Sequence, residues 1–394
     1  MSDNIIRADT EFLSVLQDVL GAQDKTMGLH EPDFQGSEWH YVKECIDSGW
    51  VSSVGKYVDE FEARLSEFTG ASHVVAVANG TVALQVALRL AGVEIGDEVL
   101  VPTLTFVATA NAVCHVGAVP HFADAEVSTL GLDPDVLEEY LAQIVEIRGG
   151  RPINRYTGRR LAAVIPMHVF GHAMRIDRLL EVAGKYRITV VEDAAESLGT
   201  SFGGQHTGTF GLLGTLSFNG NKIITTGGGG AIMTNDPILG KRAKHLTTTA
   251  KQPHPWRFFH DEVAYNFRMP NLNAALGCAQ LECLPRFVEQ KRCLAARYRS
   301  AFKTTQGISF VDEPSGSKSN FWLNAVRINS GGTVIRDSLL EIANQSGYQC
   351  RPAWDLMHTL PMFSNNPSAN LSVSEELAAS LINLPSSAKL GKEK

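Results

Sequence analysis

The chain of 394 residues has no long hydrophobic run, since no stretch approaches the roughly 20 apolar residues that a membrane-spanning helix needs. Its N-terminal residues, MSDNIIRADTEF, contain early acids and no apolar signal core. These absences predict neither membrane insertion nor secretion, so we expect a cytoplasmic protein.

Clusters of basic residues are also missing. Lysine and arginine together number 35 against 42 aspartates and glutamates, which gives a net charge of −7. A chain without a positive field or a basic patch is not expected to bind nucleic acid. An anionic small molecule would therefore need a local basic pocket.

The cysteines lack the paired spacing of zinc or redox sites, so we expect buried free thiols and no metal site. The lysine-containing phosphate loop and the dinucleotide fingerprint are also absent, which leaves an unrelated nucleotide-binding α/β protein without support. The six cysteines are Cys45, Cys114, Cys278, Cys283, Cys293 and Cys350.

What the sequence does contain, from about Val74 onward, is a series of short apolar runs alternating with helical periods. This alternation predicts an α/β fold with a mainly parallel sheet covered on both faces. We predict an N-terminal arm over residues 1–35, a large domain over 36–255, and a linker helix with a smaller α+β domain over 256–394. The expected strands are Val74–Ala78, Glu98–Val101, His121–Ala125, Ala162–His168, Ile188–Glu192 and Phe321–Ile328, and the expected helices are Gly80–Leu90, Ala108–Val116, Pro134–Val145, Asp177–Lys185, Leu272–Phe302, Val334–Gln345 and Ser374–Ile382.

Two acids, Asp193 and Glu196, follow the β-branched strand expected at Ile188–Glu192. Open α/β sheets bind ligands at the carboxyl ends of their strands, so both acids lie where a site would form. If a pyridine ring with a phenolic oxygen is bound there, Asp193 can keep its ring nitrogen protonated and Glu196 can reach its phenolic oxygen. The two acids would then share one proton. The alternatives are a helix N-cap for Asp193 and a capping-box residue for Glu196.

Lys222 lies between a strand-like segment ending near Ser217 and the glycine run Gly227–Gly230. Glycines allow the backbone to approach a bound group closely. A lysine in such a place can lose its proton, as Schiff-base chemistry requires. The alternative is an ordinary solvated loop lysine.

A phosphate site is predicted at Asn79-Gly80-Thr81, between a strand and its helix, because helix N-termini offer free N–H groups and a positive dipole end. The Ser217 hydroxyl can donate a further hydrogen bond to this phosphate, and the Phe106 side chain can cover the face of a flat ring. The alternatives are a plain capped helix for the tripeptide and a core position for Phe106. A lysine, an acid, phosphate donors and a flat apolar group are together what pyridoxal phosphate requires of a protein.

In order and spacing these segments resemble the DegT/DnrJ-type sugar aminotransferases, a branch of the fold-type I pyridoxal-phosphate enzymes. The resemblance runs from about Gly36 to Pro385 and rests on the segments Gly49–Val58, Asn79–Thr81, Glu192–Ser197, Ser217–Lys222, Tyr265–Met269 and Arg351–Trp354. The first segment, with Leu29-His30-Glu31-Pro32 and Ile223–Gly230, is similar to the subgroup named after the legionaminic-acid pathway enzyme LegC. Those enzymes aminate C4 of a UDP-linked 4-keto-6-deoxy-N-acetylhexosamine.

This resemblance implies a fold-type I structure with a seven-stranded, mainly parallel sheet in the large domain and a smaller C-terminal α+β domain. It implies that Lys222 forms the Schiff base, that Asp193 pairs with the pyridine nitrogen, and that Glu196 approaches the phenolic oxygen. It also implies that Gly80, Thr81 and Ser217 hold the phosphate and that Phe106 covers the ring.

Asn266 matches a position that reaches the phosphate of the neighbouring subunit, which implies a homodimer with shared active sites. Tyr57, His168, Arg351 and His358 lie in matching segments and are expected to contact the substrate.

The implied reaction transfers an amino group from L-glutamate to C4 of a UDP-linked 4-keto-6-deoxy-N-acetylhexosamine, in bacterial surface-glycan or nonulosonic-acid biosynthesis. Sugars linked to GDP or dTDP are alternatives. A sugar dehydratase of the same scaffold has histidine in place of Lys222. A non-catalytic nucleotide-sugar-binding regulator is the alternative of another class, and it needs neither Lys222 nor Asp193.

Overall fold

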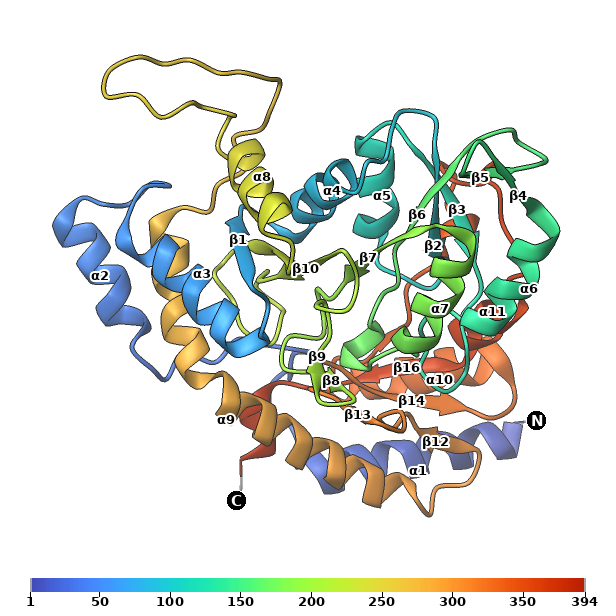
Figure 1. The fold of residues 1–394 in the computed structure, drawn as a ribbon. Helices are drawn as coiled ribbons and strands as arrows, with labels where there is room; N and C mark the ends of the chain where they lie inside the picture. The colour runs from blue at the N-terminus through green and yellow to red at the C-terminus, as the bar shows by residue number, and fades with distance from the viewer. Residues whose placement is uncertain (1, 393–394) are drawn as a thin grey trace.

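A computed structural model describes residues 2–392 of the chain, with side chains from residue 9 onward. Its largest element is a seven-stranded sheet flanked by helices (Figure 1). The strand order is β1-β11-β10-β7-β6-β2-β3. These strands are β1 (His73–Val77), β2 (Glu98–Pro102), β3 (Val119–Ala123), β6 (Leu161–Val164), β7 (Thr189–Asp193), β10 (Leu213–Ser217) and β11 (Gly230–Thr234).

The sheet is mainly parallel, as predicted. Strands β10, β7, β6, β2 and β3 run parallel to one another, whereas β11 is antiparallel to both β10 and β1. The prediction of a mainly parallel seven-stranded sheet is therefore confirmed.

Both faces of the sheet are buried. Neighbouring side chains on a strand point to opposite faces, so a single strand contributes to two hydrophobic clusters. In β1, Val75 and Val77 pack in a cluster with α4, α5 and α8, while Val74 and Ala76 pack in a cluster with α3 and α9. Helices α6 and α7 cover the other end of the sheet in a further cluster. The bounds are α2 (Glu38–Ser48), α3 (Lys56–Thr69), α4 (Gly80–Leu90), α5 (Val107–His115), α6 (Pro134–Ile144), α7 (Ile176–Tyr186), α8 (Pro237–Thr247) and α9 (Asn271–Phe302).

Beyond α9 the chain forms a smaller α+β unit around a four-stranded antiparallel sheet. Helix α1 (Ser2–Leu20) joins it, since Phe12 and Leu16 share one hydrophobic cluster with Tyr298 and Leu339, and Figure 1 shows α1 beside α9. The domain boundaries drawn from the sequence stay a prediction. The unit comprises β12 (Ile308–Phe310), β14 (Asn324–Ile328), β15 (Arg351–Pro352), β16 (Leu381–Leu384), α10 (Gly332–Gln345) and α11 (Ser372–Ser380).

Some local expectations were wrong. The helix expected over Ser374–Ile382 ends at Ser380, and the next four residues form β16 because they pair with β14 and β15. Strand β11 and several short strands of two to four residues were not predicted. The short strands are β4 (Val145–Arg148), β5 (Arg151–Asn154), β8 (Ser201–Phe202), β9 (Gln205–His206) and β13 (Ser317–Lys318).

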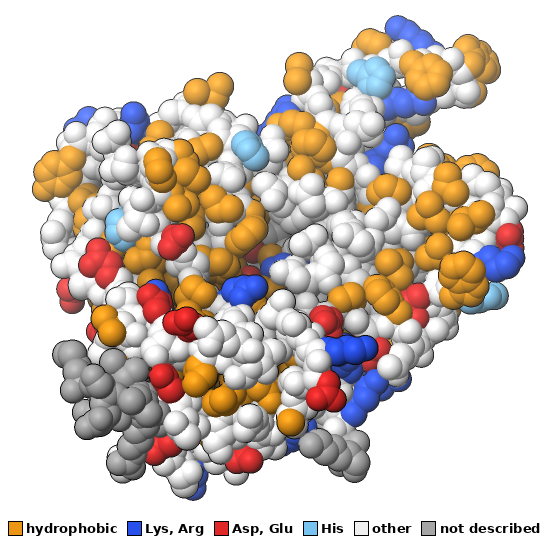
Figure 2. Space-filling model, turned by 180° about the vertical axis from the view of Figure 1, so that it is seen from behind, with side chains coloured by type: hydrophobic (Ala, Val, Ile, Leu, Met, Phe, Trp, Pro, Cys, Tyr) orange, Lys and Arg blue, Asp and Glu red, His pale blue; other side chains and the backbone are white. Residues whose placement is uncertain are grey.

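A loop over residues 250–264, which we call the projecting loop, stands away from the body of the molecule (Figure 1). It is a narrow hairpin in which the Gln252 N–H donates to the Phe259 carbonyl at 2.9 Å. Trp256 and Phe258 on it are 81% and 77% exposed. Figure 2 shows this lobe carrying hydrophobic and basic side chains.

Two compositional expectations can be compared with the structure. Four of the six cysteines are buried and none of the six forms a disulfide, but Cys114 is exposed at the end of α5 and Cys293 is partly exposed. Over residues 2–392, every helix is either too short or too polar to cross a membrane.

Candidate active site

A cavity of about 290 Å³, which we call the inner cavity, lies at the carboxyl ends of β7 and β10, beside the start of α4. This is the edge where an α/β sheet of this kind binds its ligands. It gathers seven of the residues predicted from the sequence. They are Gly80, Thr81, Phe106, Asp193, Glu196, Ser217 and Lys222.

Lys222 projects into the inner cavity from the turn that follows β10. Its Nζ lies 3.2 Å from Glu196 Oε1 and 4.1 Å from the ring centroid of Trp322. The lysine side chain is only 12% exposed, so the alternative of an ordinary solvated lysine is wrong.

Glu196 is buried beside this amine. Its Oε2 accepts the Phe170 N–H at 2.9 Å while Oε1 faces Lys222. Burial raises the pKa of Glu196 to about 7, and the nearby Lys222 charge opposes that rise. The carboxyl group therefore titrates near neutral pH, where it can exchange a proton with its neighbours.

Asp193 is the last residue of β7 and is 3% exposed. The Thr109 hydroxyl donates to its Oδ2 at 2.8 Å, and the Ala195 N–H donates to Oδ1 at 3.1 Å. Burial raises the pKa of Asp193, and these two hydrogen bonds oppose the rise. Residues 194–200 form turns and no helix, so the cap interpretations of Asp193 and Glu196 are both wrong.

The start of α4 combines a capped helix with a close approach to β10. Asn79 is the N-cap and accepts the Val82 N–H at 3.0 Å, which confirms the capped-helix interpretation. The first N–H groups of a helix have no partner within it, and Gly80 and Thr81 of this turn line the inner cavity. A Cβ on Gly80 would lie 3.0 Å from the Ser217 Cβ, so glycine brings the helix start against Ser217.

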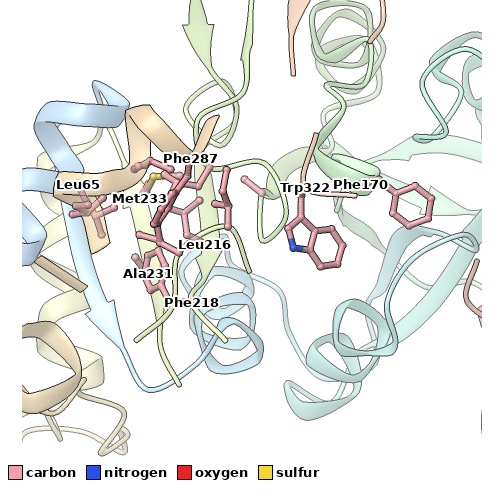
Figure 3. Packing of buried hydrophobic residues seen from close by; sticks show 14 of the residues in the cluster. Leu65, Phe170, Leu216, Phe218, Ala231, Met233, Phe287 and Trp322 are labelled. Carbon is pink, nitrogen blue, oxygen red and sulfur yellow. The ribbon is translucent and has the colours of Figure 1, made fainter. Parts of the chain in front are cut away.

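Aromatic side chains line the mouth of the inner cavity. Phe106 is 49% exposed and lines it, so the core alternative for this residue is wrong. Trp322 and Trp354 also line it and were not predicted, although Trp354 lies in a segment that carries the family resemblance. Figure 3 shows the Trp322 indole between the Leu216 and Phe218 side chains and Phe170.

A second cavity of about 920 Å³, the outer cavity, continues from the inner one, and the two share Phe106, Asn221, Trp322 and Trp354. Its walls are residues 26–31 of the N-terminal segment and residues 349–355 of the smaller unit. Of the expected substrate residues, Arg351 lines this cavity.

His358 and His168 lie outside the linings of the inner and outer cavities. His358 Nδ1 is 2.8 Å from the Thr103 hydroxyl. His168 is fully buried, with Nε2 3.0 Å from Glu192 Oε2 and with Nδ1 accepting the Met174 N–H. Because hydrogen bonds within the protein occupy both ring nitrogens, we assign His168 a structural role instead of the expected substrate contact.

Tyr57 and Asn266 also lie outside both cavities of their own chain. The Tyr57 hydroxyl donates to Glu44 Oε2 at 2.6 Å, and the residue lines a separate cavity of about 490 Å³. Asn266 is exposed at the base of the projecting loop, bridged to Thr248. The role predicted for Asn266 lies in the partner subunit, and the roles of both residues stay predictions.

The residues present fit pyridoxal phosphate. A buried amine, a buried carboxyl group with a raised pKa, helix-terminal N–H groups and aromatic rings all line a single cavity. Its volume is close to the lower end of the range of about 300–1,000 Å³ for small-molecule sites, as a compact cofactor requires. Lys222, Asp193, Gly80, Thr81 and Ser217 would hold the group.

A family model for the DegT/DnrJ/EryC1/StrS aminotransferase family matches residues 32–394. The chain belongs to this family. EpsN of Bacillus subtilis (strain 168), named a pyridoxal phosphate-dependent aminotransferase, is 37% identical over 339 residues, covering 86% of this chain and 84% of EpsN. GDP-perosamine synthase of Vibrio cholerae is 37% identical over 337 residues, covering 86% and 87%.

Among solved structures, that of DesI in the presence of its TDP-sugar product superposes with a TM-score of 0.81 at 29% identity, covering 94% of this chain and 91% of DesI. These findings identify the protein as a pyridoxal-phosphate-dependent aminotransferase of fold-type I. The alternative of a non-catalytic regulator is therefore wrong. The LegC-like subgroup stays a prediction.

Proposed function

We propose that this aminotransferase transfers the amino group of L-glutamate to C4 of a UDP-linked 4-keto-6-deoxy-N-acetylhexosamine, in the synthesis of a bacterial surface glycan or nonulosonic acid. The observation that carries the proposal is the continuity of the two cavities. The inner cavity holds Lys222, Glu196 and Asp193, and the adjoining outer cavity is large enough for an extended small molecule.

When bound, pyridoxal phosphate supplies an electrophilic carbon for amines and a ring that accepts electrons. Lys222 Nζ would carry the proton that leaves Cα of glutamate and later deliver a proton to C4 of the sugar. Asp193, held by Thr109 and the Ala195 N–H, would keep the ring nitrogen protonated. Glu196 would hold or release a proton beside Lys222, since burial raises its pKa to about 7.

The choice of UDP rests on the segments Gly49–Val58 and Leu29–Pro32 and their resemblance to the LegC-like subgroup. A GDP-linked 4-keto-6-deoxy sugar is the second candidate, and the 37% identity to GDP-perosamine synthase favours it. The two candidates differ in the base and in the substituent at C2 of the sugar, so one substrate panel separates them.

We also propose a homodimer in which each chain completes the site of the other. The projecting loop exposes Trp256 and Phe258, and such large apolar groups at a loop tip are typical of protein contacts. Asn266 lies exposed at the base of the same loop. Docking of this loop on a partner would carry Asn266 toward the partner's cavity.

The test is incubation of purified enzyme, pyridoxal phosphate and L-glutamate with three keto-sugars. They are UDP-4-keto-6-deoxy-N-acetylglucosamine, GDP-4-keto-6-deoxymannose and dTDP-4-keto-6-deoxyglucose. Mass spectrometry would detect the aminated product, and light scattering would give the mass of the assembly. The proposal expects the UDP-sugar to show the highest kcat/KM. A higher value for the GDP-sugar would establish the second candidate, and no amination in any arm would refute both.

A further inference from the structure

His30 is a histidine of the outer cavity whose hydrogen-bonding capacity is unused. Its ring lies 6.4 Å from the ring of Trp322, measured between centroids, and the residue lines the outer cavity. Both ring nitrogens are buried and have no hydrogen-bond partner among the described residues. Buried polar groups are nearly always paired, so an unpaired imidazole at a cavity wall indicates a missing ligand.

The backbone around His30 is fixed on both sides. The Ser386 N–H donates to the Leu29 carbonyl at 2.7 Å, and the Glu31 N–H donates to Ser387 Oγ at 2.8 Å. These contacts tie the N-terminal segment to the end of β16. The position of His30 is therefore set by the fold rather than by a free arm.

The imidazole is neutral. Burial lowers the pKa of His30 well below its ordinary value, and the charges of Lys291 and Lys222 lower it further. A neutral imidazole offers one N–H donor and one acceptor nitrogen. Such a pair suits a hydroxyl or an amide, whereas a phosphate would favour a charged partner. A 180° rotation about χ2 exchanges the ring nitrogens with ring carbons, so either edge can face a ligand.

Trp322 places His30 near the reacting end of the ligand. Lys222 Nζ lies 4.1 Å from the Trp322 ring centroid, and the same indole neighbours His30. A group that touches this indole from the outer cavity therefore lies close to the lysine that acts on the sugar ketone. Under the proposed function that group would be the sugar ring, with the nucleotide farther away.

We propose that His30 is a specificity-determining residue that hydrogen-bonds to a hydroxyl or acylamino group of the sugar ring seated against Trp322. The inference rests on the proposed function, because it takes a nucleotide-linked keto-sugar as the ligand. It adds a residue of the N-terminal segment to the site, from an element distant in sequence from Lys222.

The test uses the full-length holoenzyme with His30→Phe and His30→Asn. His172→Phe is the matched control. His172 is also buried and its two ring nitrogens have no partner within the described residues, but it lies outside the linings of both cavities. Two readouts are taken for each protein. The first is the change of the visible cofactor spectrum on adding L-glutamate alone, and the second is kcat and KM with the three keto-sugars named above.

We expect His30→Phe to keep the spectral response to glutamate and to lose about tenfold to a hundredfold in kcat/KM for the preferred sugar, as for one lost buried hydrogen bond. His30→Asn keeps a donor and an acceptor and should recover part of that loss. His172→Phe should leave both readouts unchanged. Thermal melting of each variant reports whether it is folded.

Two results would overturn the inference: a wild-type kcat/KM for His30→Phe, or an equal loss in the response to glutamate and in the sugar reaction. The second result would indicate a general structural role for His30. Failure of the proposed function would look different from failure of this inference. If the proposed function is wrong, the wild-type enzyme itself would aminate none of the three sugars.

Discussion

Replacing Glu196 by glutamine tests the electrostatics of the site without any substrate. Burial raises the pKa of Glu196 from the ordinary 4.5 to about 7, so the folded protein keeps this proton over a range where the unfolded chain has lost it. The folded state therefore binds more protons between about pH 4.5 and 7, and the free energy of unfolding falls as pH rises through that range. Glutamine is neutral at every pH and removes this contribution.

The size of the effect follows from the shift. A difference of about 2.5 pH units, at about 1.4 kcal/mol each, gives about 3 kcal/mol of pH-dependent stability. The side chain is only 1% exposed, so solvent screening is small. At pH 5 both proteins should have similar stability, whereas at pH 8 the variant should be the more stable, since the pKa of about 7 already includes the attraction of Lys222.

The assay is urea denaturation of cofactor-stripped enzyme at intervals from pH 5 to 8, comparing the wild type with Glu196→Gln. The exposed Glu139→Gln reports the general effect of removing a carboxylate. The curves for wild type and Glu196→Gln should diverge as pH rises. Parallel curves would refute the reasoning, because they would mean that Glu196 titrates alike in the folded and unfolded states.

Three further predictions concern the cofactor and the proposed dimer. Lys222→Ala should abolish the visible cofactor band and turnover, and a variant with both intact would end the assignment of the catalytic lysine. Gly80→Ala should weaken cofactor retention on dialysis by about tenfold, since its Cβ would lie 3.0 Å from a neighbouring Cβ; Gly220→Ala, whose Cβ meets nothing within 4 Å, is the control and should match the wild type. Trp256→Ser should shift the light-scattering mass toward a monomer and lower activity, while the similarly exposed Ile95→Ser should do neither. An unchanged mass for Trp256→Ser would mean that the projecting loop does not contribute to the assembly.

Local signals sufficed for much of the site. Asp193 follows a β-branched strand, Asn79 caps the helix that begins at Gly80, and Lys222 follows the next strand before a glycine run. Each of these features lies within a few residues of the group it positions, so the sequence pattern was enough to predict them. Their common location at one sheet edge follows from the parallel order of β7 and β10.

Other contacts depend on residues that are distant in sequence. Thr109 donates to Asp193 across 84 positions, and Trp322 reaches Lys222 from the smaller unit. His168 was expected at a strand end, as Asp193 was, but β6 ends at Val164 and the His168 nitrogens bond to Glu192 and to the Met174 N–H. Strand position alone could not distinguish these two residues.

The sequence by itself determined the chemistry of this protein: the lysine, the acids and the helix terminus that suit pyridoxal phosphate, in the order of an aminotransferase family. Only the tertiary structure decided which residues line the outer cavity. The outer cavity forms where residues 26–31 meet residues 349–355, and both ring nitrogens of His30 lie buried there with no hydrogen-bond partner in the part of the chain that the structure describes. The reason is physical, since burial and the loss of hydrogen-bond partners arise only when segments far apart in the chain pack together.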